Sequence, residues 1–349
     1  MQRTFSGAAP VPKAGLRWAP LALSLVLLLV VLTLAAGVGA VSLSPAEVAR
    51  AIWHGLSGQL SGTGDTIVWL IRLPRVLLAA LVGGSLALSG AAYQGVFRNP
   101  LADPYLLGVA SGAGLGATVA LVFGESLPWV FGSVPLMSFV FSLFAVGLTL
   151  LLARRRGAPS LSSGPLVSLI LAGVVLGSSA TALTSLLMLS QRDDAARVLA
   201  WLLGSFGLSS WAQLGSVLPF ALLAAVVTLA SAQGLNVLGL GEESAAGLGL
   251  RVGRFRVVLI VAATLSTAAA VSVAGIIGFA GLIVPHTVRL AVGPDHRTLL
   301  PLTLVYGAIF MVLADLAART VIAPAEVPIG VITALVGGPF FLWLLRRKV

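Results

Sequence analysis

The sequence predicts an all-α integral membrane protein with ten transmembrane helices, some of them short or broken. Only 9% of the 349 residues are charged, 58% are hydrophobic, and the mean hydropathy is +1.07. A soluble domain carries roughly 25% charged residues, so this chain cannot cover its surface with polar groups. The stretch from Gly275 to Pro301 is the second observation, because glycines and then Pro285-His286 interrupt a long apolar run. Such interruptions are typical of short helices packed inside a larger transmembrane body.

Nine uncharged runs are candidates for the spanning helices, since a span needs ~20 apolar residues. Residues 257–288 are too long for one span, because 32 residues at 1.5 Å each would give ~48 Å of helix. We expect a break at Gly275 and Gly278, followed by a short helix that ends near Leu290. The nine runs are 18–46, 76–97, 104–124, 126–153, 157–191, 198–241, 257–288, 298–314 and 327–345.

A second long run, 198–241, is also expected to divide. Its first part is predicted to be a short surface helix, and its second part a span from Gln213 to Ser231. The count of spans is then ten. Asp103 followed by Pro104 predicts the start of the third span, because an acidic N-cap before proline is a common helix start.

The positive charges predict the orientation. If the N-terminus is cytoplasmic and the chain has ten spans, the C-terminal residues Arg346, Arg347 and Lys348 lie on the cytoplasmic side, as the positive-inside rule requires. A cleaved signal peptide is the alternative at the N-terminus, but the uncharged run there exceeds a typical signal core, so we expect a retained first helix. No loop is large enough for a soluble domain, so residues 1–349 are predicted to form one transmembrane domain. The outer side keeps Arg50, Arg72, Arg75, Arg192, Arg197 and Arg319.

Composition excludes several kinds of site. The chain has no cysteine, and its lysines, at 13 and 348, do not form a P-loop. His54, His286 and His296 have no metal-ligand spacing. The net charge of +10 fits contact with anionic lipid headgroups rather than nucleic acid. We therefore expect no metal, no cofactor and no nucleic-acid partner, and a membrane-embedded enzyme would lack a convergent catalytic constellation.

An ion-coupled secondary transporter is the alternative class, and it normally needs an acid within a span. Asp315 is the one candidate, near the outer end of the ninth span. Arg319 follows one turn later, and an i,i+4 pair of this kind is more simply structural. The pairing argues against ion coupling.

Two places depart from the general pattern. Arg72, Arg75 and Arg319 lie on the outer side, against the charge bias, and have two equally supported readings: snorkelling to lipid phosphate, or a cationic dock for an acidic partner.

The cytoplasmic loop 234–254 is the other place. Glu242 and Glu243 suit the first turn of a short helix there. That helix would either rest on the headgroups or form a rigid knob for a cytoplasmic protein.

Seven segments resemble, in order, the FecCD family, the ten-span permease subunits of ABC importers for ferric siderophores, haem and vitamin B12. They span nearly the whole chain beyond the first helix. The resemblance implies a type II ABC importer permease fold, one permease domain, and ATP hydrolysis by a partner subunit rather than by this chain. The segments are 72–75 (RLPR), 89–112 (SGAAYQGVFRNPLADPYLLGVASG), 199–208 (LAWLLGSFGL), 238–250 (LGLGEESAAGLGL), 278–289 (GFAGLIVPHTVR), 295–301 (DHRTLLP) and 325–334 (AEVPIGVITA).

The resemblance also assigns roles to residues. Those implied to receive acidic residues of an extracytoplasmic substrate-binding protein are Arg72, Arg75 and Arg319. Those implied to couple the permease to the ATPase are Leu238, Gly241, Glu242, Glu243, Ala246, Gly247, Leu248 and Gly249. Those assigned to the pathway and its short helix are Gly278, Pro285, His286 and Arg289. By analogy, the fifth span (Val167–Leu189) and parts of the tenth also line the pathway.

The resemblance implies a homodimer with two ABC ATPase subunits beneath it, in the cytoplasmic (inner) membrane of a bacterium or archaeon. Closure of the ATPases would rock the two halves between inward-open and outward-open states. A ferric siderophore is the favoured cargo. Cobalamin follows closely, since residues 295–301 and 325–330 also resemble vitamin B12 permeases, and haem remains open.

Overall fold

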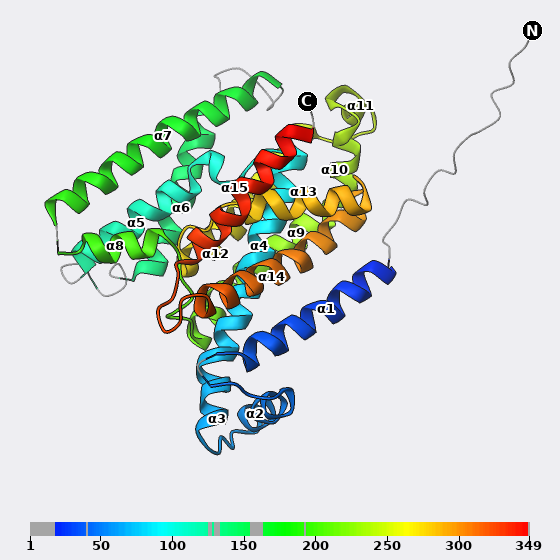
Figure 1. Ribbon diagram of the computed structural model, residues 1–349. Coiled ribbons are helices and arrows are strands. Elements are labelled where there is room, and N and C mark those ends of the chain that lie inside the picture. The colour runs from blue at the N-terminus through cyan, green and yellow to red at the C-terminus, as the bar shows by residue number, and fades with distance from the viewer. Residues whose placement is uncertain are drawn as a thin grey trace, which may run out of the picture.

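The computed structural model describes residues 18–39, 41–124, 128, 133–153, 163–191 and 193–347, and every regular element in them is a helix (Figure 1). Seven described helices are long and apolar enough to cross a membrane, and three shorter apolar helices accompany them. The predicted all-α fold with ten apolar segments is thereby confirmed. Of the basic residues named above for the orientation, Arg192 and Lys348 lie outside the described residues.

The ten helices follow the predicted runs closely. The long helices are α1 (Trp18–Gly37), α4 (Leu73–Phe97), α6 (Val134–Ala153), α7 (Ser163–Ser190), α9 (Trp211–Ala230), α12 (Val252–Ala274) and α14 (His296–Thr320). The shorter ones are α5 (Val109–Phe123), α13 (Ala280–Val292) and α15 (Ile329–Arg347). A four-residue helix, α3 (Thr63–Thr66), and a π-helix, η1 (Ile67–Arg72), lead without interruption into α4.

The third span starts later than the sequence predicts. Asp103 is an N-cap, but of a 3-10 turn, η2 (Pro104–Leu107), and Gly108 then takes a positive φ of 86° before α5 begins at Val109. The Asp103 carboxylate accepts the backbone N–H of Tyr105 at 2.7 Å. The cap-plus-proline signal therefore marked a real helical start, but that of a turn outside the spanning helix.

The predicted break in the 257–288 run is confirmed. Helix α12 ends at Ala274, Gly275 has a φ of 73°, and residues 275–279 are not helical. Phe279 adopts a φ of 68°, an uncommon conformation for a bulky residue. The short α13 then runs to Val292, two residues beyond the expected end, with Pro285 inside it.

Helix α4 forms the centre of the fold, where it packs against α12, α13 and α14. Two glycines explain how closely the backbones approach. A Cβ at Gly90 would stand 1.8 Å from the carbonyl oxygen of Gly281 in α13, and one at Gly83 would stand 2.2 Å from that of Gly307 in α14. Small residues at helix crossings let backbones meet in lipid, where apolar tails give helix association no hydrophobic drive.

Short helices gather at the two ends of the molecule (Figure 1). At one end, hereafter the α11 end, lie α10 (Ala232–Gly239), α11 (Glu242–Gly247) and the last turn of α15. At the other, the α2 end, lie α2 (Pro45–Ser57) and α3. The surface helix predicted before the sixth span exists as α8 (Ala195–Leu202), and a turn separates it from α9, as expected.

Candidate functional site

The loop predicted to contact a cytoplasmic partner forms the two short helices α10 and α11. Gly241 and Gly249 flank α11 with φ values of 112° and 87°, a backbone conformation that glycine adopts without strain. Glu242 and Glu243 stand in the first turn of α11, and Gly247 is its last residue. The predicted short helix is confirmed, whereas its contact with an ATPase stays a prediction.

Two leucines form an exposed apolar tip on this loop. Leu240 and Leu248 are each 67% exposed, although both are large and apolar. Leu238, which the resemblance placed among the coupling residues, is instead fully buried, as is Ala245. Leu238 therefore anchors α10 to the body, while the surface available to a partner is the leucine tip. Other predicted coupling residues exposed beside it are Glu243, Ala246, Gly247 and Gly249.

Polar contacts fix the loop to two long helices. The Glu242 carboxylate accepts a hydrogen bond from the Arg256 guanidinium of α12 at 2.7 Å, and the Arg256 side chain is fully buried. On α10, Asn236 donates to the Asp295 carboxylate at 2.6 Å and accepts the backbone N–H of His296 at 2.9 Å. Since Asp295 caps α14, these contacts join α10 and α11 to α12 and α14.

At the α2 end, Arg72 and Arg319 bind the last carbonyl groups of α1. The Arg72 guanidinium donates to Ala36 O at 3.0 Å and Gly37 O at 2.8 Å, and Arg319 donates to the carbonyl oxygen of Ala35. The last carbonyls of a helix have no partner within it and attract cations. These two arginines therefore end α1 and hold it to the bundle.

Arg75 holds two carboxylates at once. Its guanidinium donates to Asp315 at 2.8 Å and to Glu326 at 2.7 Å. Asp315 is the buried member, with 2% of its side chain exposed, whereas 43% of Glu326 is exposed. Arg75 attracts the carboxylate of Glu326 and lowers its pKa. The sequence predicted that Asp315 pairs with Arg319, but that distance is 3.6 Å, so Arg75 in α4 is the main partner.

The structure thus gives the three predicted docking arginines partners within the chain. Arg72 is 6% exposed and its guanidinium is turned toward the carbonyl groups of α1, and its contact with lipid or a binding protein stays a prediction. Arg75 and Arg319 keep 12% and 8% of their side chains exposed. Their contact with a substrate-binding protein stays a prediction. The cluster of Arg72, Arg75, Arg319, Asp315 and Glu326 keeps one net positive charge.

Three of the four residues assigned to the pathway, Pro285, His286 and Arg289, lie in α13, and the fourth, Gly278, lies just before it. Gly278 lies in the break, and open space surrounds the position of a Cβ there. Pro285 and His286 are buried in α13, and the imidazole of His286 meets the ring of Phe340 edge-on at 6.5 Å. Arg289 donates to the Gln94 side chain in α4 at 2.9 Å. Of the four, only Gly278 lines the cavity described next, to which α13 contributes Leu282 instead, and the pathway role of the other three stays a prediction.

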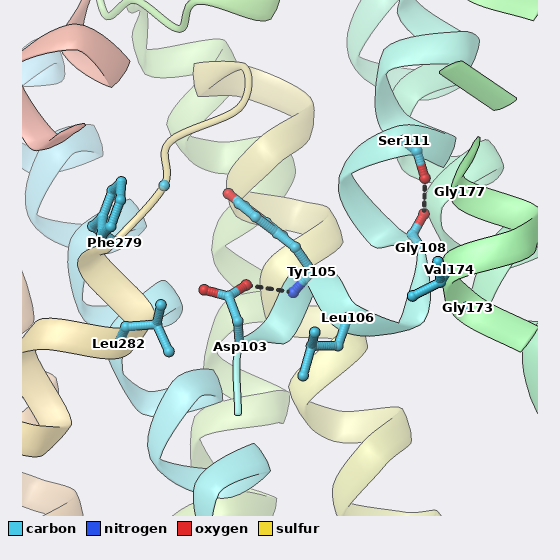
Figure 2. A pocket seen from close by; sticks show the side chains of 11 residues that line it. Asp103, Tyr105, Leu106, Gly108, Ser111, Gly173, Val174, Gly177, Phe279 and Leu282 are labelled. Carbon is cyan, nitrogen blue, oxygen red and sulfur yellow. Dashed lines mark hydrogen bonds between the residues drawn. The ribbon is translucent and has the colours of Figure 1, made fainter. Parts of the chain in front are cut away.

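An open cavity of about 420 Å³ lies between η2, α7 and the break that precedes α13 (Figure 2). Its lining is largely apolar, with Leu106, Val174 and Phe279 among the contributors. Asp103 supplies a carboxylate: one oxygen accepts the Tyr105 N–H, and the other points away from it, toward Leu282 and Phe279 (Figure 2). Burial raises the pKa of this carboxyl to about 6, although the Tyr105 hydrogen bond opposes the shift.

Sequence reasoning missed several of these residues. Asn236, Arg256 and Glu326 carried no local signal, because their partners lie in other helices. Asp103 was recognised only as a helix cap, yet it also faces the cavity. In the part of the chain that the structure describes, no group of three His, Asp or Glu residues is placed to hold a metal ion.

A polytopic helical body with a broken helix at its centre and an exposed pair of short helices at one end has the architecture of a transport permease. The comparisons with known proteins give the family. The sequence profile of the FecCD transport family matches residues 27–347. The chain belongs to the FecCD transport family, and it is a permease subunit of an ABC transporter that is not itself catalytic.

Individual relatives agree with this assignment. An uncharacterised ABC transporter permease, YvrB of Bacillus subtilis, is 43% identical, and the match covers 86% of each chain. The hemin transport permease HmuU of Yersinia pestis is 41% identical over 93% of this chain and 94% of its own. The cobalamin import permease BtuC of Halobacterium salinarum is 44% identical over 82% and 75%.

A solved structure is also similar. It shows an inward-facing conformation of a transporter assigned to the metal-chelate type of ABC transporters. Its TM-score is 0.82 at 33% sequence identity, and the match covers 95% of this chain and all of that one. The fold predicted from the resemblance is confirmed.

Proposed function

We propose that this chain is the permease subunit of an ABC importer that moves a metal chelate across the cytoplasmic membrane by alternating access. The observation that carries the proposal is the exposed tip of Leu240 and Leu248, attached through Glu242 and Asn236 to α12 and α14. An apolar tip on a well-anchored loop is suited to a groove on a partner protein. We propose two ABC ATPase subunits as that partner, bound to a homodimer of this chain.

Helix α14 is the element that would connect the two ends of the molecule. Its first turn is bonded to α10 through Asn236, and Asp315 in its last two turns is bonded to Arg75. It also packs along α4 over much of its length. A displacement of α10 by the ATPases would therefore move α14 and, with it, the Arg75–Asp315–Glu326 group.

The α2 end is the proposed docking face for the substrate-binding protein. Arg75 and its partly exposed partner Glu326 lie there, and the cluster has one net positive charge. A positive patch of this kind steers and orients an acidic partner more than it adds affinity. Arg72 would act indirectly, by fixing the end of α1 beside the docking face.

A ferric siderophore is the cargo we propose, and cobalamin and haem are the other outcomes of the test. Two of the relatives named above are a cobalamin import permease and a hemin transport permease, which supports the metal-chelate class as a whole. The secondary-transporter alternative loses its candidate acid, because Asp315 is bonded to Arg75 through both carboxylate oxygens.

The test is ATPase stimulation in nanodiscs that hold the permease with its candidate ATPase. A binding protein loaded with ferric siderophore, cobalamin or haem is added in turn. Stimulation by one loaded binding protein would support the importer and name the cargo. Failure of the wild-type permease to bind an ABC ATPase would overturn the proposal.

The leucine tip has its own prediction. Leu248→Arg should abolish both ATPase co-purification and transport, because a charge would replace an apolar contact at the centre of the interface. Leu208→Arg is the matched control for ATPase co-purification, since Leu208 is 89% exposed in the turn before α9, and the whole of α9 separates it from α10 along the chain. Normal transport by Leu248→Arg would show that α11 does not couple to the ATPase.

A further inference from the structure

The cavity beside α7 has the size and lining of a small-molecule site. At about 420 Å³ it lies within the range of ~300–1,000 Å³ that is typical of ligand pockets. Glycines create the hollow: Gly173 and Gly177 bring α7 against η2 and α5, and Gly278 leaves open space at the break. The shape is therefore set by backbone packing, so it exists before a ligand arrives.

Asp103 gives this cavity a charge that capping does not require. Its cap to Tyr105 uses one oxygen, and an asparagine would serve that purpose equally well. The second oxygen faces a lining that is largely apolar (Figure 2). An ionised carboxylate in such surroundings is destabilised unless a cation or further donors approach it.

Three other acids of the described chain that are at least partly buried have arginine partners. Asp315 and Glu326 share Arg75, and Glu242 is bonded to Arg256. Asp103 has no ion pair among the described residues, and its carboxylate makes one hydrogen bond. The cavity is thus the place where a carboxylate is kept beside an apolar hollow with room for a ligand.

We propose that the cavity binds an amphipathic organic cation, whose apolar body fills the hollow beside α7 and whose protonated amine pairs with Asp103. A rigid alkylammonium is the simplest ligand of this class. If the import function proposed above holds, on which this extension rests, the site favours a chelate that carries a protonated amine over the same chelate with that amine acetylated.

Binding of 1-adamantylammonium to the full-length permease in zwitterionic nanodiscs tests the proposal, with empty nanodiscs subtracted. The neutral 1-adamantanol has nearly the same shape and serves as the matched ligand. We expect the cation to bind saturably to the wild type. Its affinity for Asp103→Asn should be about tenfold or more weaker, because a partly buried charge pair is lost. The alcohol should bind both proteins alike, since asparagine keeps the cap.

A second variant tests the space rather than the charge. Gly278→Leu should block both ligands by filling the hollow, whereas Gly147→Leu, also in open space but on α6 away from the cavity, should block neither. Absence of saturable binding to the wild type, or equal affinity of the cation for Asp103→Asn, would overturn the proposal. The assay needs no ATPase or binding protein, so its failure is distinct from failure of the proposed import function.

Discussion

The two ends of the molecule use arginine–carboxylate pairs in different ways. At the α11 end, the buried Arg256 reaches outward to one acid, Glu242, whose side chain is 23% exposed. At the α2 end, Arg75 binds the buried Asp315 and the exposed Glu326 together, while Arg72 and Arg319 hold the carbonyl groups of α1. The α11 end joins its loop to α12 through an arginine–glutamate pair and to α14 through Asn236, whereas the α2 end shares one arginine between two acids.

The difference reflects what each end leaves for a partner. The network at the α2 end pairs both of its carboxylates within the chain, so it stabilises the junction of α1, α4 and α14. The tether at the α11 end instead holds a small loop whose exposed surface is apolar, with Leu240 and Leu248 at its tip. We infer that the α2 end offers a partner a charged surface on a rigid junction, whereas the α11 end offers an apolar surface on a small loop.

The largest expected effect comes from breaking the network at its buried acid. Asp315→Ala should lower the free energy of unfolding by about 3–5 kcal/mol, because it leaves Arg75 and Arg319 partly buried without their shared carboxylate. Chemical denaturation in detergent would measure the loss. Asp194→Ala is the control, since its partner Arg197 is 70% exposed and such surface pairs contribute about 1 kcal/mol or less.

An intermediate effect is expected at the α10–α14 junction. Asn236→Ala removes the hydrogen bonds to Asp295 and His296, so α10 should follow the ATPase without moving α14. Transport should fall by roughly three- to tenfold, which corresponds to about 1 kcal/mol of lost coupling, while basal ATPase activity persists. Transport and ATP hydrolysis would be measured together in proteoliposomes. Gln233 is exposed on the same helix, so Gln233→Ala should change neither transport nor ATP hydrolysis. Equal transport by both variants would contradict a coupling role for the α10–α14 junction.

The smallest effect concerns the exposed acid of the network. Arg75 lowers the pKa of Glu326 below its ordinary value of 4.5, so the pairing stabilises the fold above pH about 4.5. That contribution is lost as the pH falls through the lowered pKa, when Glu326 is protonated. The melting temperature of the wild type should therefore fall more steeply than that of Glu326→Gln below pH about 4.5. Parallel curves for the two proteins would show that the exposed pair contributes nothing measurable.

Much of the fold could be predicted because its signals are local. Glycines at 275 and 278 and an over-long apolar run located the break, and Glu242, Glu243 and Gly247 located α11. The predicted start of α5 was about one turn too early, since a cap before proline does not show whether a 3-10 turn or a spanning helix follows. The candidate site was harder to predict, because the packing of the bundle buries Leu238 and Arg72, and no local signal in the sequence shows that burial.

By itself, the sequence determined that this chain crosses the membrane about ten times, where its helices break, and which family it resembles. Hydropathy, glycine and proline act over a few residues, so they can be read in order along the chain. Only the tertiary structure decided that Asp315 belongs to Arg75, 240 positions away, and that Asn236 meets Asp295. It also decided that Asp103 faces a cavity formed by glycines of another helix. Ion pairs and cavities depend on which helices pack together, and that packing is set by the whole bundle at once.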